Sequence, residues 1–218
     1  MDKMDNNNTK DNNIVTIHGT FVTGFSFSHE IYGEKFYITH INVPRLSDSI
    51  DTIPVMVSER LLDINKNYLE PEYYVVISGQ FRSFNLHGSN EEHHLVLYVF
   101  AKEINILKNP KSEDISVLPN SIFLDGYVCK KPIYRKTPLG REIADVLLAV
   151  NNSYGKSSYI PCICWGRNAR FADTFNIGDH IQITGRIQSR TYQKQDTLKV
   201  AYEVSVAKLN KVEEVGAA

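Results

Sequence analysis

The chain has 218 residues, of which 42% are hydrophobic and 22% charged, and its mean hydropathy is −0.27. This composition supports a buried core and excludes a mostly disordered or fibrous protein. No apolar run approaches the ~18 residues of a membrane span, and the polar first residues contain no signal-peptide core, so we expect a cytoplasmic protein without membrane contact. The three cysteines lack the C-x-x-C spacing of a zinc site, and we expect neither disulfides nor a metal or other cofactor.

The net charge of −1 conceals an uneven distribution along the chain. Residues 1–110 carry nine Lys and Arg against fourteen Asp and Glu, a net charge of −5. Residues 111–218 carry fifteen against eleven, a net charge of +4. A basic half favours a polyanionic partner, although scattered basic residues more often form a solvated face.

The two halves of the chain repeat each other. Landmarks of the first half recur in the same order 106 or 107 positions later, beginning with Gly19, which matches Gly126, and Gly33, which matches Gly140. The further matches are Thr52–Val55 with Tyr159–Cys162, Ile77–Gln80 with Ile183–Arg186, and Ala101-Lys102 with Ala207-Lys208. A near-constant offset along the whole chain indicates a tandem duplication of one fold.

In chain order, we expect a disordered tail over residues 1–13, a first domain over 14–104, a linker over 105–119, a second domain over 120–210 and a short tail over 211–218. The linker is polar and contains two prolines. In the second domain, β-branched and alternating apolar residues predict five strands, at Ser121–Cys129, Ile143–Asn151, Tyr159–Trp165, His180–Arg190 and Thr197–Lys208. A short helix is predicted after the third strand, at Arg167–Phe175, with a counterpart at Ser58–Asn65 in the first domain.

Five strands with a small helix after the third follow the element order of an OB-fold. This fold is a Greek-key barrel whose exposed face and loops bind oligonucleotides or oligosaccharides. The predicted fold class is therefore all-β, with two tandem OB-folds, each a five-stranded barrel with a short helix between strands 3 and 4.

Alternation along the strands of the second domain separates core from surface side chains. The predicted core positions are Ile160, Cys162, Cys164, Ile181, Ile183 and Ile187. The predicted outward positions are Tyr159, Ile163, Trp165, Thr184, Arg186, Gln188, Arg190 and Tyr192. Exposed aromatic rings among arginines suit single-stranded nucleic acid, because each ring stacks on a base at ~1–3 kcal/mol and each cation contacts phosphate.

Four motifs of the second domain form an ordered set. They are Pro132-x-x-Arg135-x-x-Pro138-x-Gly140, Leu147–Asn151, Tyr159–Cys162 followed by Trp165-Gly166-Arg167, and Gly185–Tyr192. With this set, the chain resembles the bacterial single-stranded-DNA-binding protein family from about Ser121 to Lys208. The resemblance implies base stacking on Tyr154, Tyr159, Trp165 and Tyr192, and phosphate contacts at Arg135, Arg186 and Arg190. Lys130 and Lys194, at strand ends, are further phosphate-binding candidates.

The resemblance also implies a function and partners. We expect a sequence-tolerant, nucleoid-associated protein that coats and protects single-stranded DNA in replication, recombination or repair. The expected partners are single-stranded DNA, a second copy of the chain in a homodimer with four OB-folds, and replication or repair proteins. The last residues, KVEEVGAA, lack the glycine-rich segment and acidic tip that are typical of the family, so we do not expect recruitment of partners through such a tail.

The first copy lacks the implied site residues at the matching positions. Thr52 stands in place of Tyr159 and Ser58 in place of Trp165. The further replacements are Ser47 for Tyr154, about Leu86 for Tyr192, Gln80 for Arg186 and Phe84 for Arg190. We therefore expect a degenerate first OB-fold with a structural or assembly role. The alternative is a shifted binding surface that uses Phe25, Phe27, Tyr32 or Phe84.

Other interpretations stay open at the level of sequence. Tyr159 and Trp165 also suit a subunit contact, since Trp and Tyr are enriched in protein interfaces. His87, His93 and His94 flank a predicted turn, where a solvated loop competes with a metal or pH-sensitive cluster. An enzyme is not expected, because the chain has no phosphate-binding glycine loop, no G-x-S-x-G and no H-E-x-x-H. The alternative function is a primosome-type accessory OB protein that acts mainly through protein contacts and binds DNA weakly.

Overall fold

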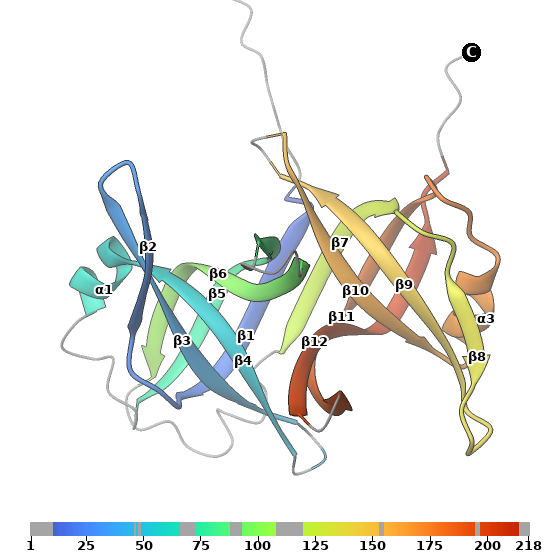
Figure 1. The fold of residues 1–218 in the computed structure, drawn as a ribbon, viewed down its shortest axis with the longest axis horizontal. Coiled ribbons are helices and arrows are strands. Elements are labelled where there is room, and N and C mark those ends of the chain that lie inside the picture. The colour runs from blue at the N-terminus through green and yellow to red at the C-terminus, as the bar shows by residue number, and fades with distance from the viewer. Residues whose placement is uncertain are drawn as a thin grey trace, which may run out of the picture.

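Strands make up most of the chain in the computed structural model, which describes residues 11–45, 47, 49–65, 73–87, 93–107, 120–152, 155–194 and 197–213. The first domain contains β1 (Asn13–Phe21), β2 (Ser26–Ile31), β3 (Glu34–Pro44), β4 (Ile50–Ser58), α1 (Glu59–Asn65), β5 (Tyr74–His87) and β6 (His93–Leu107). The second contains β7 (Ser121–Val128), β8 (Ile133–Lys136), β9 (Glu142–Asn151), β10 (Ser157–Trp165), α3 (Arg167–Asp173), β11 (His180–Lys194) and β12 (Thr197–Lys211). Two barrels lie side by side, with β1 and β7 between them (Figure 1).

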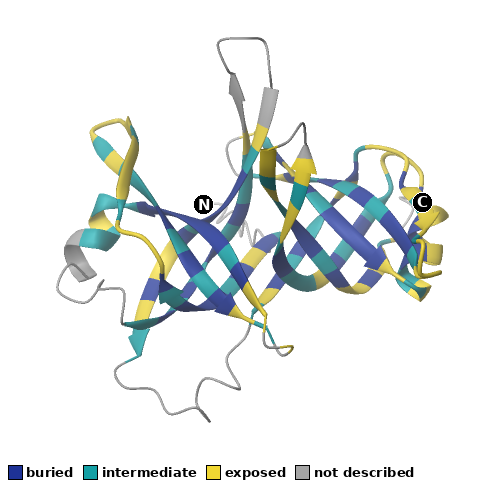
Figure 2. Ribbon diagram, turned by 60° about the horizontal axis from the view of Figure 1, so that its bottom comes forward, coloured by how far each residue is buried: buried dark blue, intermediate teal, exposed yellow. Residues whose placement is uncertain are grey.

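Each domain closes into a barrel around alternating apolar side chains. In β4, for example, Ile53, Val55 and Val57 are fully buried, as their spacing of two residues requires. Neighbouring strands are antiparallel except for β4 with β6 and β10 with β12, which pair in parallel. Pairing of β1 with β3, and of β7 with β9, completes the barrels. Figure 2 shows buried segments running through both barrels, and the predicted pair of OB-folds is confirmed.

The two barrels share one sheet. β1 pairs with β7 in antiparallel register, with Ile14 opposite Phe123 and Val15 opposite Ile122. Because Val15 also lies opposite Gly79 of β5, the strand β1 bonds to one neighbour in each domain. The twelve strands of the described residues therefore form a single sheet, a connection that the periodicity of the separate strands did not predict.

A buried carboxylate provides a second connection between the barrels. Asp51 at the start of β4 is fully buried, forms an ion pair with Arg45, and accepts hydrogen bonds from the backbone N–H (2.6 Å) and hydroxyl (3.1 Å) of Ser189 on β11. Arg45 in turn donates to the carbonyl oxygen of Ser189 at 3.1 Å. Although burial alone would raise the pKa of Asp51, the hydrogen bonds from Arg45 and Ser189 hold it below its ordinary value. The ionised carboxylate thus joins β11 of the second barrel to β4 of the first.

The observed elements extend several predicted ones. β11 runs to Lys194 and β12 to Lys211, and β6 runs to Leu107, so Asn105–Leu107 belong to a strand rather than to the expected linker. β2 and β8, which form hairpins with β3 and β9, were not predicted. β1 begins at Asn13, the last residue of the expected tail. No helix in the described part of the chain is long and apolar enough to cross a membrane.

Candidate nucleic-acid interface

Strand β10 divides its side chains between core and surface as predicted. Ile160, Cys162 and Cys164 point inward and are at most 3% exposed. On the other face, the side chains of Tyr159 and Trp165 are 43% and 39% exposed. Large aromatic side chains are therefore accessible at both ends of the outward face of β10. Ile163 lies between them on the same face but is buried.

Strand register extends this face across the second barrel. Ile163 pairs with Asp145 of β9 on one side and with Ser205 of β12 on the other. Ser205 pairs with Arg186 of β11, and Asp145 with Ile133 of β8. Paired residues of neighbouring strands point to the same side of a sheet. We call the outward side chains of β8 to β12 the stacking face.

Basic side chains on the stacking face are partly neutralised by acids. Arg135 forms an exposed ion pair with Asp145, its neighbour across the β8–β9 hairpin. Arg190 lies 3.7 Å from Glu203, which also accepts a hydrogen bond of 2.8 Å from Gln188. Neither acid was predicted as part of the site. Each acid lies on the neighbouring strand diagonally from its cation, since Asp145 pairs with Ile133 and Glu203 with Gln188, and only the register reveals this.

The remaining predicted cations differ in what they contact. Arg186 is half-buried on β11, and Lys130 is exposed just after β7. The guanidinium of Arg190 lies 5.7 Å from the ring centroid of Tyr192. Tyr154, and the side chain of Lys194, lie outside the described residues, as do the side chains of His87, His93 and His94.

Each of the three described stacking candidates lines a hollow in the surface. Trp165 lines one of about 390 Å³, Tyr159 one of about 310 Å³, and Tyr192 one of about 510 Å³. Trp165 and Tyr159 lie six residues apart on one strand, a span of roughly 20 Å at the rise of a β-strand. The hollows at Tyr159 and Tyr192 share Leu95 and Tyr98, so the three candidates lie along one extended path.

The hollow at Trp165 has a basic rim that the sequence motifs did not reveal. Lys136 and Arg141, from the β8–β9 hairpin, line it together with Glu142. Glu142 bonds to Arg170 at 2.5 Å and accepts a hydrogen bond of 2.7 Å from Tyr134, so its charge is compensated locally. The sequence feature that could have predicted this rim is the presence of Lys136 and Arg141 on either side of the hairpin turn that contains Gly140.

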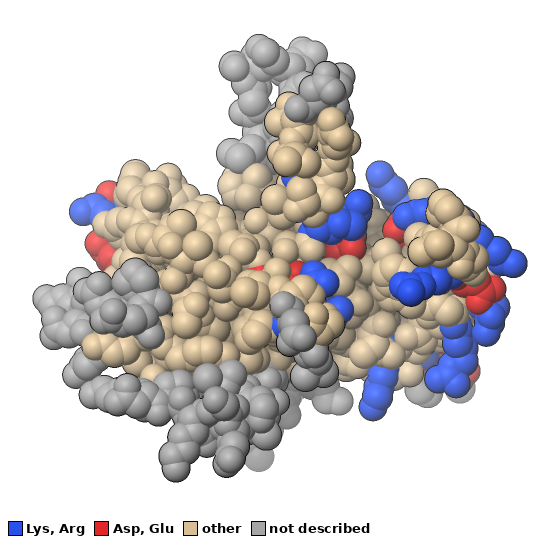
Figure 3. Space-filling model, turned by 90° about the horizontal axis from the view of Figure 1, so that it is seen from below, with Lys and Arg blue, Asp and Glu red and all other residues tan. Residues whose placement is uncertain are grey.

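Charge is distributed unevenly over the two barrels. Lys and Arg atoms gather over the second OB-fold, on the right of Figure 3, and are sparse over the described surface of the first. Burial raises the pKa of Tyr98 and of Tyr202, two residues that line the hollow at Tyr192. A phenol is already neutral at physiological pH, and burial makes these two harder still to ionise, so they add no negative charge to the surface.

Comparison with known proteins gives consistent matches. The model of the single-strand binding protein family matches residues 119–212, which contain the second OB-fold. Single-stranded DNA-binding protein B of Bacillus subtilis (strain 168) is 32% identical over 88 residues, covering 37% of this chain and 78% of that protein. Single-stranded DNA-binding protein 1 of Staphylococcus aureus (strain COL) is also 32% identical over 88 residues, with 37% of this chain and 53% of that protein covered.

The fold match extends over both domains. The wild-type single-stranded DNA binding protein from Thermus aquaticus superposes with a TM-score of 0.75 at 18% sequence identity, covering 94% of this chain and 95% of that one. At this identity the match demonstrates the shared fold alone. Together with the stacking face and the sequence matches in the second domain, it leads to one assignment: the chain belongs to the single-strand binding protein family.

Proposed function

We propose that this protein binds single-stranded DNA with little sequence preference, through the stacking face of its second OB-fold. The observation that carries the proposal is that Tyr159, Trp165 and Tyr192 each line a hollow along one extended path. Every base has a π-face, so stacking at ~1–3 kcal/mol per base gives affinity without reading the sequence. The names of the Bacillus subtilis and Staphylococcus aureus relatives support the same ligand.

Phosphate contacts complete the proposed mechanism. Arg186, Arg190 and Arg135 are the proposed contacts, and Lys136 and Arg141 join them because they line the hollow at Trp165. The resemblance to the family adds Tyr154 as a stacking residue and Lys130 and Lys194 as phosphate contacts. Arg135 leaves Asp145 when it contacts phosphate, since a single guanidinium exchanges one anion for another. Duplex DNA binds poorly, because its bases stack on each other rather than on protein rings.

The single tryptophan makes the proposal directly testable, since Trp165 is the only Trp in the chain. Poly-deoxythymidine is expected to quench the intrinsic Trp fluorescence strongly, whereas duplex DNA of equal length leaves it unchanged. Trp165→Ala is expected to weaken binding by ~1–3 kcal/mol, the contribution of one stacked base. Unchanged emission at saturating poly-deoxythymidine would remove Trp165 from the site. Absence of any binding by fluorescence polarisation would overturn the function itself.

We further propose that two copies associate through the outer face of β1 and β7 and of the strand segments that pair with them, residues 74–79 of β5 and 180–185 of β11. At its centre, Ile14 is 47% exposed and pairs with Phe123, and Tyr127 of β7 is 40% exposed. Exposed apolar side chains on a broad sheet favour a protein contact. A homodimer places four OB-folds along one strand of DNA, which suits coating and protection of single strands at the nucleoid during replication, recombination or repair. Replication and repair proteins are the further proposed partners.

A further inference from the structure

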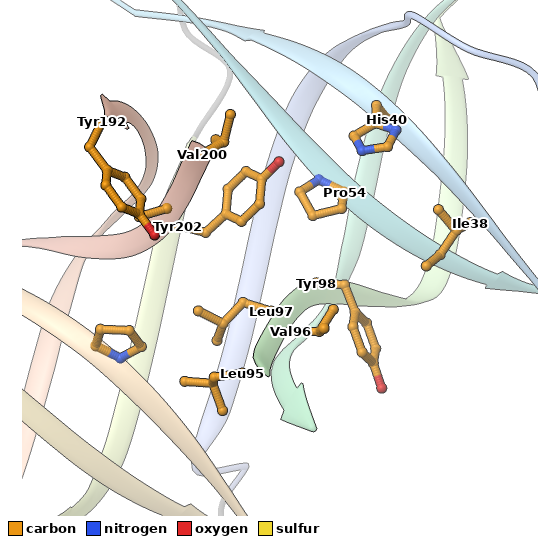
Figure 4. A pocket seen from close by; sticks show the side chains of 12 residues that line it. Ile38, His40, Pro54, Leu95, Val96, Leu97, Tyr98, Tyr192, Val200 and Tyr202 are labelled. Carbon is orange, nitrogen blue, oxygen red and sulfur yellow. The ribbon is translucent and has the colours of Figure 1, made fainter. Parts of the chain in front are cut away.

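Two of the hollows adjoin each other at the boundary between the OB-folds. The hollow at Tyr159 and the hollow at Tyr192 share Leu95 and Tyr98, both from β6 of the first domain. We call these adjoining hollows the seam. Its walls come from both domains, since Ile38, His40 and Pro54 of the first face Tyr192, Val200 and Tyr202 of the second (Figure 4).

The first domain contributes an exposed aromatic ring and a cation to the seam. Phe84 of β5 is 38% exposed and packs edge to face against Tyr98, with ring centroids 5.8 Å apart. Arg82, two residues earlier, lies 3.9 Å from the ring centroid of Phe100 and donates a 2.7 Å hydrogen bond to Gln80. These contacts orient the guanidinium while it still lines the hollow at Tyr159.

The second domain supplies the complementary side of the seam. Tyr159 and Lys156 line the hollow that contains Phe84 and Arg82, and Tyr192 lines the adjoining one. Tyr159 is held there because its backbone N–H donates a 2.7 Å hydrogen bond to the hydroxyl of Ser83. Among the described residues, the lining of the two hollows includes Arg82 and Lys156 but no Asp or Glu. The seam is thus apolar and aromatic with a basic margin.

We propose that the seam is part of the single-stranded DNA site and that the first OB-fold contributes Phe84, Arg82 and Tyr98 to it. The inference rests on the proposed function, because Tyr159 and Tyr192 are stacking residues of the second domain. Bases enter the apolar hollows beside Phe84, Tyr159 and Tyr192, and phosphates contact Arg82 and Lys156. The rings suit bases. A basic margin without acids suits their phosphates.

This assignment changes the role expected for the first domain. Matching by sequence offset equates Phe84 with Arg190, and therefore counts it as a lost cation. The register shows what the substitution does: Phe84 lies opposite Val96 and Arg82 opposite Tyr98, so an aromatic ring and a cation still alternate on β5. The first OB-fold does not repeat the site of the second; it completes that site from the opposite side.

Moving the only tryptophan into the seam tests the proposal. In a Phe84→Trp chain that also carries Trp165→Tyr, all Trp emission comes from position 84. Saturating oligo-deoxythymidine is expected to quench it. The matched control places the Trp at Ile31 of β2, which is 49% exposed and lines neither hollow, and its emission is expected to stay constant. Constant emission at position 84 would overturn the proposal and leave the seam to a protein partner or a second copy.

Affinity provides the second measurement. Phe84→Ala is expected to weaken oligo-deoxythymidine binding by about 5- to 160-fold, the equivalent of one stacked base. Ile31→Ala is expected to leave affinity unchanged. Circular dichroism establishes that both variants are folded. If the unaltered chain binds no single-stranded DNA, the proposed function fails together with the inference. If it binds and Phe84→Ala binds equally well, only the inference fails.

Discussion

Arg135 and Asp145 show how single residues set the strength of the proposed interface. Their ion pair is exposed on both sides, so it contributes at most about 1 kcal/mol to stability. Its larger consequence is electrostatic, because Asp145 places a negative charge on a surface proposed to bind phosphates. Asp145 thus orients the guanidinium of Arg135 but weakens the electrostatic attraction between this surface and DNA.

Removing that acid is expected to strengthen binding. In Asp145→Asn, Arg135 is free to contact phosphate, so affinity rises several-fold and the slope of log affinity against log salt becomes steeper by about 0.7, the value of one single-strand contact. Arg190→Gln is expected to flatten the slope by a similar amount. Titrations at several salt concentrations measure both. An unchanged slope in both variants would exclude Arg135 and Arg190 from the phosphate contacts.

The charge of the Asp51 carboxylate stabilises the contact between the two barrels, so the free energy of unfolding depends on its ionisation. Its pKa is below the ordinary value of 3.8 in the folded chain, so its stabilising contribution is fully present above about pH 4 and is lost as pH falls through the folded pKa. Asp51→Asn leaves Arg45 without its buried partner and is expected to cost about 3 kcal/mol of unfolding free energy. Urea denaturation is expected to show this loss near neutral pH and a smaller one in acid. Equal losses at both pH values would contradict a stabilising role for the ionised Asp51 carboxylate.

At the scale of elements, two repeated glycine pairs, Gly19 with Gly126 and Gly79 with Gly185, are positions where strands approach too closely for a side chain. A Cβ at Gly126 would lie 2.3 Å from the carbonyl oxygen of Ala149, and one at Gly185 would lie 2.2 Å from that of Ser205. Gly79 and Gly185 also follow register shifts at matching places, between β5 and β6 and between β11 and β12. Barrel closure explains why these glycines recur in both copies.

Gly185→Ala is therefore expected to destabilise the second barrel, by about 3 kcal/mol or more, because backbone atoms rather than a flexible side chain must move. The matched control is Gly24→Ala, where the added Cβ has no neighbour within 4 Å. Its effect is expected to stay within about 1 kcal/mol in either direction. Thermal denaturation compares the two variants, and similar melting temperatures would contradict the close-approach argument.

The strands that apolar periodicity failed to predict are β2 and β8, because most of their side chains are exposed. Five of the six residues of β2 are exposed and the other is half-buried, and β8 has a similar pattern. A strand exposed on both faces has no apolar alternation to detect. Such strands project beyond the core, yet the β8–β9 hairpin carries Arg135 to the stacking face and Lys136 and Arg141 to the hollow at Trp165.

At the scale of the whole molecule, the exposed outer sheet face predicts the assembly state. Light scattering is expected to give a mass near twice the 24.8 kDa of the chain. Ile14→Glu introduces a charge at the centre of this face, where Ile14 pairs with Phe123, and is expected to yield a folded monomer. A dimer that persists in Ile14→Glu would place the contact elsewhere. The control is Ile133→Glu, at an isoleucine of β8 that is more exposed than Ile14, 63% against 47%, and lies outside this face.

The sequence by itself determined the fold class, the duplication, and which side chains of β10 and β11 point into the core. These are local properties: alternation of apolar residues dictates the faces of a strand, and the OB element order follows from the strand and helix signals. Ile160, Cys162, Cys164, Ile181, Ile183 and Ile187 are all buried as predicted. The resemblance in the second domain also led to the family, which the comparisons established.

Only the tertiary structure decided what lies beside what. Residues far apart in the chain meet where β1 pairs with β7, where Asp51 binds Ser189, and in the seam. The periodicity of single strands does not encode such contacts. The offset between the copies shows which positions correspond, but it does not show which residues lie next to each other. It therefore treated Phe84 only as the replacement of a cation, although Phe84 and Tyr159 line the same hollow. Local pattern fixes the direction of a side chain, whereas its neighbours depend on how the chain closes on itself.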